Sequence, residues 1–171
     1  MRNKSLLNIT YTAIFTALIL LATSVLKFST GLGEGYIHLG DCFVYLSACV
    51  LPFPYCLIAS ALGGALADVL GSFAIWSVPT AIIKMLIASP FAIVCKKSVK
   101  ILNKKTVLMT VVSGVITILG YFVAECILYS VASATLSLIG NTIQAVASGI
   151  LFIIIAKATD KINLKRRINN G

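Results

Sequence analysis

VLMTVVSGVITILGYFVAECILYSV, residues 107–131, is a 25-residue stretch that holds a single charged side chain, Glu125. A helix needs about 20 apolar residues to cross the roughly 30 Å hydrocarbon core of a membrane, and this stretch is long enough to do so. The rest of the chain has the same character, because 59% of its 171 residues are hydrophobic and only 11% are charged. Soluble domains are about 25% charged. The composition therefore predicts an integral membrane protein.

Polar or helix-breaking turns divide the chain into six apolar segments. Glycine and serine follow the first segment, and Pro52 and Pro54 separate the second from the third, because proline cannot continue a helical hydrogen-bond ladder. We therefore expect one domain over 1–171, an all-α integral membrane bundle of six transmembrane helices. Their expected ranges are about 6–28, 39–51, 55–70, 78–94, 107–131 and 135–158. We expect the basic tail after Asp160 to be frayed.

The basic residues gather on one predicted side of the membrane. With a cytoplasmic N-terminus, the inner segments hold two of them at the N-terminus, five in the loop 96–105 and five at the C-terminus, or 12 of 14. Because Lys and Arg concentrate in cytoplasmic loops, we expect both termini to be cytoplasmic in a plasma-membrane protein. This placement also explains the net charge of +9, and we expect no nucleic-acid partner.

Cysteine and histidine spacing does not indicate a metal site. The five cysteines form no C-x-x-C pair and the chain has one histidine, whereas structural zinc sites draw four ligands from such residues. We expect the cysteines to act as small hydrophobic residues within helices, and we expect no metal and no cofactor.

Polar side chains in apolar helices are costly and usually face a cavity or one another. Six of them, from five predicted helices, fall in the outer half of the membrane, with Lys84 and Glu125 at depths of roughly 9 Å. The predicted inner half has no comparable group. This pattern predicts a pocket that is open to the outside and closed below, which suits a small polar molecule. A structural ion pair, such as Lys84 with Glu125, is the alternative. The six are Asp41, Asp68, Lys84, Glu125, Asn141 and Gln144.

Two predicted outer loops add aromatic side chains to this pocket. In the first, Tyr36 and His38 could stack on or hydrogen-bond a ring, and the preceding glycines permit a lid that orders on binding. Trp76 in the next outer loop could be a stacking surface. A passive connector and an interfacial aromatic anchor are the respective alternatives. The expected lid residues are Gly31, Gly33, Glu34 and Gly35. The expected substrate-binding residues are Tyr36, His38, Asp41, Asp68, Trp76, Lys84, Glu125, Asn141 and Gln144.

Several of these stretches, in this order, resemble the substrate-specific S components of energy-coupling factor (ECF) transporters. The matching stretches are Gly35-Tyr-Ile-His-Leu-Gly-Asp41, Gly63-Gly-Ala-Leu-Ala-Asp68, Ile75-Trp-Ser-Val-Pro-Thr80 with Lys84, and Gly140-Asn-Thr-Ile-Gln144. The resemblance covers nearly the whole chain. It is closest to the branch that contains hydroxymethylpyrimidine and pyridoxine transporters, which is often labelled riboflavin-type.

The resemblance implies a substrate-binding subunit that captures a small vitamin or vitamin precursor on the outer side. It also implies three partners, namely a transmembrane coupling protein (the T component) and two cytoplasmic ATPases. In the family an A-x-x-x-A motif on the first helix docks against the coupling protein, and Ala13 and Ala17 match it. The chain itself has no G-x-x-x-x-G-K-[ST] stretch. We therefore expect a transport subunit that is not an enzyme, with ATP hydrolysed by its partners.

Other functions make different demands on the sequence. A stand-alone ion-coupled secondary transporter of a small polar metabolite would favour polar residues across the midplane or an inverted repeat, and neither is evident. A membrane enzyme would need a motif such as H-E-x-x-H or a nucleophile elbow. A lipid-embedded assembly factor would bind no ligand. The mixture of charges, amides and aromatic rings suits a flat heterocycle with hydroxyls, while riboflavin, a queuosine precursor or another vitamin are alternatives.

Overall fold

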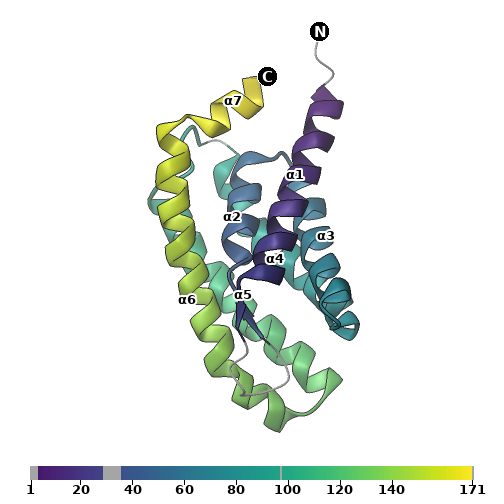
Figure 1. Cartoon of the computed structure of the whole chain (residues 1–171). Coiled ribbons are helices and arrows are strands. Elements are labelled where there is room, and N and C mark those ends of the chain that lie inside the picture. Colours follow the sequence, from purple (N-terminus) through teal and green to yellow (C-terminus); the bar gives the residue numbers. More distant parts are fainter. Residues whose placement is uncertain (1–3, 29–35, 97, 171) are drawn as a thin grey trace.

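The computed structural model describes residues 4–28, 36–96 and 98–170, and these residues form an almost entirely helical bundle (Figure 1). The expected lid residues Gly31, Gly33, Glu34 and Gly35 lie outside the described residues. The helices are α1 Lys4–Val25, α2 Asp41–Val50, α3 Tyr55–Leu70, η1 Ala74–Trp76, α4 Ser77–Cys95, α5 Lys104–Leu128, α6 Val131–Lys161 and α7 Leu164–Asn170. The strands are β1 Lys27–Phe28 and β2 Ile37–His38.

The two ends of the bundle carry different elements. Both chain termini lie at one end, together with α7 and the α4–α5 loop, and we call this the terminal end (Figure 1). The β1–β2 pair, the α3–α4 connection and the α5–α6 turn lie towards the other end, which we call the cavity end.

Among the described residues, four helical segments are long and apolar enough to cross a membrane. They are Lys4–Val25, Ala74–Cys95, Lys104–Leu128 and Val131–Lys161, with mean hydropathies between 1.8 and 2.2. The helices α2 and α3 are shorter, with 10 and 16 residues. At 1.5 Å per residue α2 is only about 15 Å long, so it does not cross a membrane alone. Nine of its ten residues are buried, which places α2 inside the bundle.

The surface of α5 shows why the bundle requires lipid. Large apolar side chains project outward at spacings of three and four residues and are about half exposed or more, among them Leu108, Val111, Val115, Leu119 and Val123. In water, so large an apolar surface would drive association. In a bilayer the same surface faces hydrocarbon, in agreement with the predicted membrane location.

A short strand pair replaces the end of the first predicted helix. Helix α1 ends at Val25, and Lys27 and Phe28 pair antiparallel with His38 and Ile37. The pairing satisfies backbone groups that a helix end would otherwise leave without partners. Two-residue strands are too short to show an alternating pattern, so the sequence did not indicate them.

The C-terminal tail is folded, so the prediction of a frayed tail is wrong for Leu164–Asn170. Leu164 and Ile168 lie one helical turn apart and pack on the core, and Ile168 is only 6% exposed. The ammonium of Lys165 donates to the backbone oxygen of Cys95 at 2.6 Å and so caps the end of α4. Apolar residues four apart are enough for a short amphipathic helix to cover the terminal end.

An aromatic floor separates the two ends. It consists of Tyr45, Phe91 and Phe152 from α2, α4 and α6, and all three are fully buried. The Tyr45 and Phe91 rings stack with centroids 4.6 Å apart, and the Phe91 and Phe152 rings meet nearly edge-on at 5.1 Å. These contacts close the interior of the bundle below the cavity end.

Two glycines let other groups pass close to α3. A Cβ at Gly63 would lie 2.7 Å from Cβ of Ile19, so only glycine lets α1 approach here. A Cβ at Gly64 would lie 2.8 Å from Cγ of Lys84, so Gly64 makes room for the lysine stem. Gly63 and Gly64 therefore serve packing within the chain.

Candidate ligand-binding site

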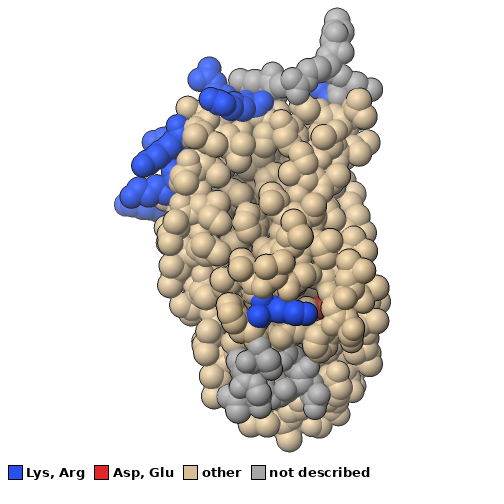
Figure 2. Space-filling view, in the orientation of Figure 1, with Lys and Arg blue, Asp and Glu red and all other residues tan. Residues whose placement is uncertain are grey.

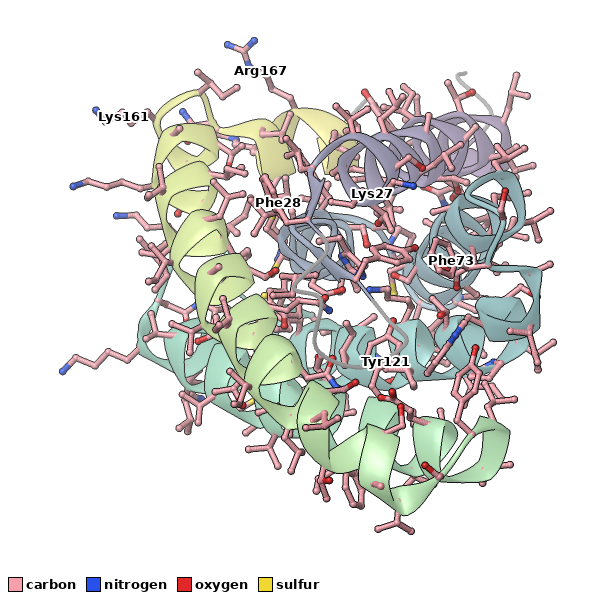
Figure 3. All side chains as sticks on the ribbon, turned by 60° about the horizontal axis from the view of Figure 1, so that its bottom comes forward. Lys27, Phe28, Phe73, Tyr121, Lys161 and Arg167 are labelled. Atoms are coloured by element: carbon pink, nitrogen blue, oxygen red, sulfur yellow. The ribbon has the colours of Figure 1, made fainter. Side chains whose placement is uncertain are left out.

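A cavity opens at the cavity end between β2, α3, α4, α5 and α6. Its empty volume is about 570 Å³, with the open space at its mouth included. Figure 3 is turned towards this end and shows Phe73 beside α3 and Tyr121 on α5. The lining residues are Tyr36, Ile37, His38, Asp68, Phe73, Trp76, Thr80, Tyr121, Glu125, Ser137, Gly140, Asn141 and Gln144.

Seven of the nine residues expected to bind substrate line this one cavity. They come from elements far apart in the sequence, and they are Tyr36, His38, Asp68, Trp76, Glu125, Asn141 and Gln144. The other two, Asp41 and Lys84, are fully buried and are not part of the cavity wall.

Asp41 and Lys84 form a buried ion pair. The structure thus gives Lys84 a different carboxylate partner from the Glu125 that the structural alternative named. Gln144 extends the pair into a buried network, because its Nε2 donates to Oδ2 of Asp41 at 3.0 Å. Its Oε1 accepts the backbone N–H of His38 at 3.2 Å. The network ties the chain next to the cavity to α2, α4 and α6.

His38 completes the buried network as a neutral ring. Its Nε2 lies 3.2 Å from Nζ of Lys84, and its Nδ1 accepts the backbone N–H of Gly40 at 3.2 Å. Burial, followed by the charge of Lys84, lowers the pKa of His38 to about 3. The imidazole therefore adds no positive charge to the cavity at neutral pH.

Tyr36 and Asp68 are hydrogen-bonded to each other in one wall of the cavity. The Tyr36 hydroxyl donates to Oδ1 of Asp68 at 2.7 Å, and its ring lies 4.9 Å from that of Phe73. Burial and the Asp68 carboxylate raise the pKa of Tyr36, so the phenol stays protonated and remains a donor. Oδ2 of Asp68 and Nδ2 of Asn141 are both buried and have no hydrogen-bond partner among the described residues.

Glu125 and Trp76 are held on the other walls. Oε1 of Glu125 accepts the hydroxyls of Ser133 and Ser137, each at 2.8 Å. Trp76 is 6% exposed and its Nε1 donates to the Tyr129 hydroxyl at 3.3 Å. An interfacial anchor would face the lipid, so the structure favours the cavity wall over the anchor interpretation of Trp76.

Comparison with known families adds an independent finding. Residues 3–161 match the family described as ECF-type riboflavin transporter, S component. The chain belongs to this family. A comparison with curated proteins finds no match. An S component is a membrane-embedded transport subunit that binds substrate, associates with the T component and ATPases, and is not an enzyme.

The S component contains further cavity residues that the sequence interpretation missed. Phe73, Thr80 and Tyr121 line the cavity beside the predicted residues. Two of them carried a usable signal, since Thr80 lies four residues before Lys84 and Tyr121 four before Glu125, and such pairs share a helix face. Phe73 carried no such signal, because it lies in the short connection between α3 and η1.

Ala13 and Ala17 lie on the outward surface of the S component. Both are exposed, one helical turn apart on α1, while Phe15 and Ile19 on the same helix are buried. The two alanines therefore leave a narrow surface of small side chains that the described part of the chain does not cover.

Proposed function

We propose that this S component captures a hydroxymethylpyrimidine- or pyridoxine-like heterocycle in the cavity and presents it for uptake. The observation that carries the proposal is the convergence of seven predicted binding residues on one cavity above an aromatic floor. Four aromatic rings could stack on a flat ligand, and carboxyl, amide and hydroxyl groups could bind its edge. The rings are Tyr36, Phe73, Trp76 and Tyr121.

We propose that α1 to α6 all lie within the membrane and that both termini are cytoplasmic. Figure 2 supports this orientation, because Lys and Arg gather at the terminal end and Lys and Arg concentrate on the cytoplasmic side. The cavity would then face the outside. The shortness of α2 agrees with this arrangement, because α2 is enclosed by other helices and does not need to span the lipid.

Energy for release would come from partner subunits. We propose that Ala13 and Ala17 form the docking surface for the T component, since small exposed side chains permit close approach of a second membrane helix. The two ATPases would bind through the T component on the cytoplasmic side. Substituting tryptophan for either alanine should abolish uptake in cells but leave binding by the isolated subunit intact.

The aromatic floor weighs against a stand-alone ion-coupled carrier. Such a carrier needs polar groups along the whole path. Between the cavity and the terminal end lie three aromatic rings in contact, two of them stacked and the third edge-on to both. Purification of the tagged subunit from its native membrane should recover a coupling protein and ATPases, and their absence would favour the carrier.

Riboflavin is the second candidate ligand, because the family description names it. Calorimetry of the protein in nanodiscs with hydroxymethylpyrimidine, pyridoxine and riboflavin tests the choice directly. We expect saturable binding of one of the first two at a 1:1 ratio. Tight binding of riboflavin alone would keep the transport role and reject the proposed branch, and no binding of any of the three would reject the proposed function.

A further inference from the structure

We infer that the cavity selects a non-phosphorylated ligand bearing an amino group next to a ring nitrogen, and that Asp68 is the carboxyl group that binds this edge. The inference rests on the proposed function and narrows its substrate class. It depends on the charges around the cavity and on two buried polar atoms of its wall that have no partner in the part of the chain that the structure describes.

The charge balance disfavours an anion. The lining includes two carboxyl side chains, Asp68 and Glu125, and among the described residues no Lys or Arg. Lys84 lies nearby but its charge is matched by Asp41. With all four side chains ionised, three carboxylates and one ammonium give a local charge of −2. A phosphate group would therefore lose its hydration without gaining a cation inside.

Lys27 does not reverse this balance. Its ammonium lies outside the cavity wall, 5.5 Å from the ring centre of Tyr36 and 5.9 Å from that of Phe73, and the residue is exposed. Counting it changes the local charge only from −2 to −1. As an exposed charge it is also screened by water and salt.

Asp68 is the carboxyl group best placed to accept a ligand. The residue is 3% exposed, and its Oδ2 has no hydrogen-bond partner among the described residues. Its Oδ1 accepts the Tyr36 hydroxyl at 2.7 Å, and a carboxylate oxygen can accept a second bond. Glu125 is less suited, because Ser133 and Ser137 already donate to one of its oxygens.

Asn141 supplies the complementary group on the opposite helix. Its Nδ2 is buried without a partner among the described residues, and the residue lines the same cavity. A buried donor or acceptor without a partner is unfavourable, so a ligand that satisfies both atoms gains affinity. The ligand should therefore present N–H donors at one edge and an acceptor, such as a hydroxyl, at another.

An amino group next to a protonated ring nitrogen fits Asp68 in particular. It offers two parallel N–H donors, which match the two oxygens of one carboxylate in a charge-assisted pair. A ring with oxygen in place of the amino group loses one donor and places an acceptor against the carboxylate. Such a mismatch rejects an analogue strongly, because buried polar groups are left unpaired.

The test compares three ligands on the full-length protein in nanodiscs by calorimetry at pH 7. They are 4-amino-5-hydroxymethyl-2-methylpyrimidine, its phosphate monoester, and the analogue with oxygen in place of the amino group. We expect the ester to bind about 100-fold more weakly and the oxygen analogue at least about tenfold more weakly. Asp68→Asn should cost the amino compound about tenfold or more in affinity and reduce its advantage over the oxygen analogue.

Asp160→Asn is the matched control, because it removes a carboxylate at the terminal end and should leave all three affinities unchanged. If the ester or the oxygen analogue binds as tightly as the amino compound, the inference is wrong while binding itself still supports the proposed function. If no pyrimidine, pyridoxine or riboflavin binds, the proposed function fails, and the inference fails with it. The relative affinities of the three ligands for the wild-type protein test the inference even if Asp68→Asn does not fold.

Discussion

The cavity end and the terminal end of this bundle share helices, but their polar side chains have different roles. At the cavity end, charged and amide side chains are buried, and two polar atoms of the cavity wall, Oδ2 of Asp68 and Nδ2 of Asn141, lack partners among the described residues. At the terminal end, Lys165 and Asp160 use their charges to cap backbone groups of α4 and of the α4–α5 loop. Between them lies the aromatic floor.

The difference separates groups kept for binding from groups kept for folding. The unpartnered atoms of Asp68 and Asn141 line the cavity, where a ligand can complete their hydrogen bonds. Charges that satisfy helix ends raise stability and need no ligand. Substitutions at the cavity end should therefore change affinity, and substitutions at the terminal end should change stability alone. The buried network is the exception, because it lies at the cavity end and supports the fold.

Lys84→Ala should give the largest loss of stability of the substitutions considered. It measures how much the buried network contributes to folding, although the network lies at the cavity end. Removing the lysine leaves the carboxylate of Asp41 buried without its charge partner, which costs about 3–5 kcal/mol in the free energy of unfolding. Thermal unfolding in detergent should show the loss. The double substitution Asp41→Asn with Lys84→Met should recover much of it, because neither charge is then left unpaired. Unchanged unfolding of Lys84→Ala would show that the pair carries no structural role.

Gly63→Ala tests the close contact between α1 and α3. The added methyl group would lie 2.7 Å from Cβ of Ile19 and 3.0 Å from the backbone oxygen of Thr16. Overpacking of this kind costs about 1–3 kcal/mol. Gly114→Ala is the matched control, because its nearest neighbour would be Cβ of Ala145 at 3.4 Å, an ordinary contact. Equal melting temperatures for the two variants would contradict the close approach of α1 to α3.

Lowering the pH should weaken the cavity end through His38. Its pKa is about 3 in the folded protein and 6.5 in an unfolded chain, so the unfolded state takes up the proton first as the pH falls. Stability is then complete above pH 6.5 and declines towards pH 3, by at most about 1.4 kcal/mol per pH unit from this group. His38→Gln should have a shallower dependence of melting temperature on pH. An unaltered dependence would mean that His38 is not the group responsible.

Lys165→Met should give the smallest effect, confined to the terminal end. The change removes the bond from Nζ to the backbone oxygen of Cys95 and keeps most of the apolar stem. A loss of about 1 kcal/mol in the free energy of unfolding is expected. Ligand affinity, measured by calorimetry, should stay the same, and a drop in affinity would show that the two ends are coupled.

Particular residues show what the sequence could and could not predict. The bounds of α3, Tyr55–Leu70, were predicted as observed, because Pro54 and Gly71 mark its two ends. The strand pair and α7 were missed, since two paired residues and two apolar positions one turn apart give almost no periodic signal. These misses changed the outline of the fold little.

The partners of the buried charges were harder to predict than their existence. A lysine in an apolar helix indicated a buried polar site, but spacing along the chain does not tell which carboxylate it meets. The pairing with Asp41 depends on the short α2 entering the bundle beside α4, and on Gly64 leaving room for the lysine stem. Both conditions depend on tertiary structure, and neither can be predicted from the sequence of one helix alone.

The fluorescence of Trp76 tests most directly whether the ligand occupies this cavity, because Trp76 is the only tryptophan in the sequence and lines the wall. Titration of the protein in nanodiscs with the vitamin that calorimetry identifies should change the emission of Trp76 saturably, with the same dissociation constant that calorimetry gives. Full binding by calorimetry with no change in the emission of Trp76 would place the ligand elsewhere and contradict the assignment of the cavity as the binding site.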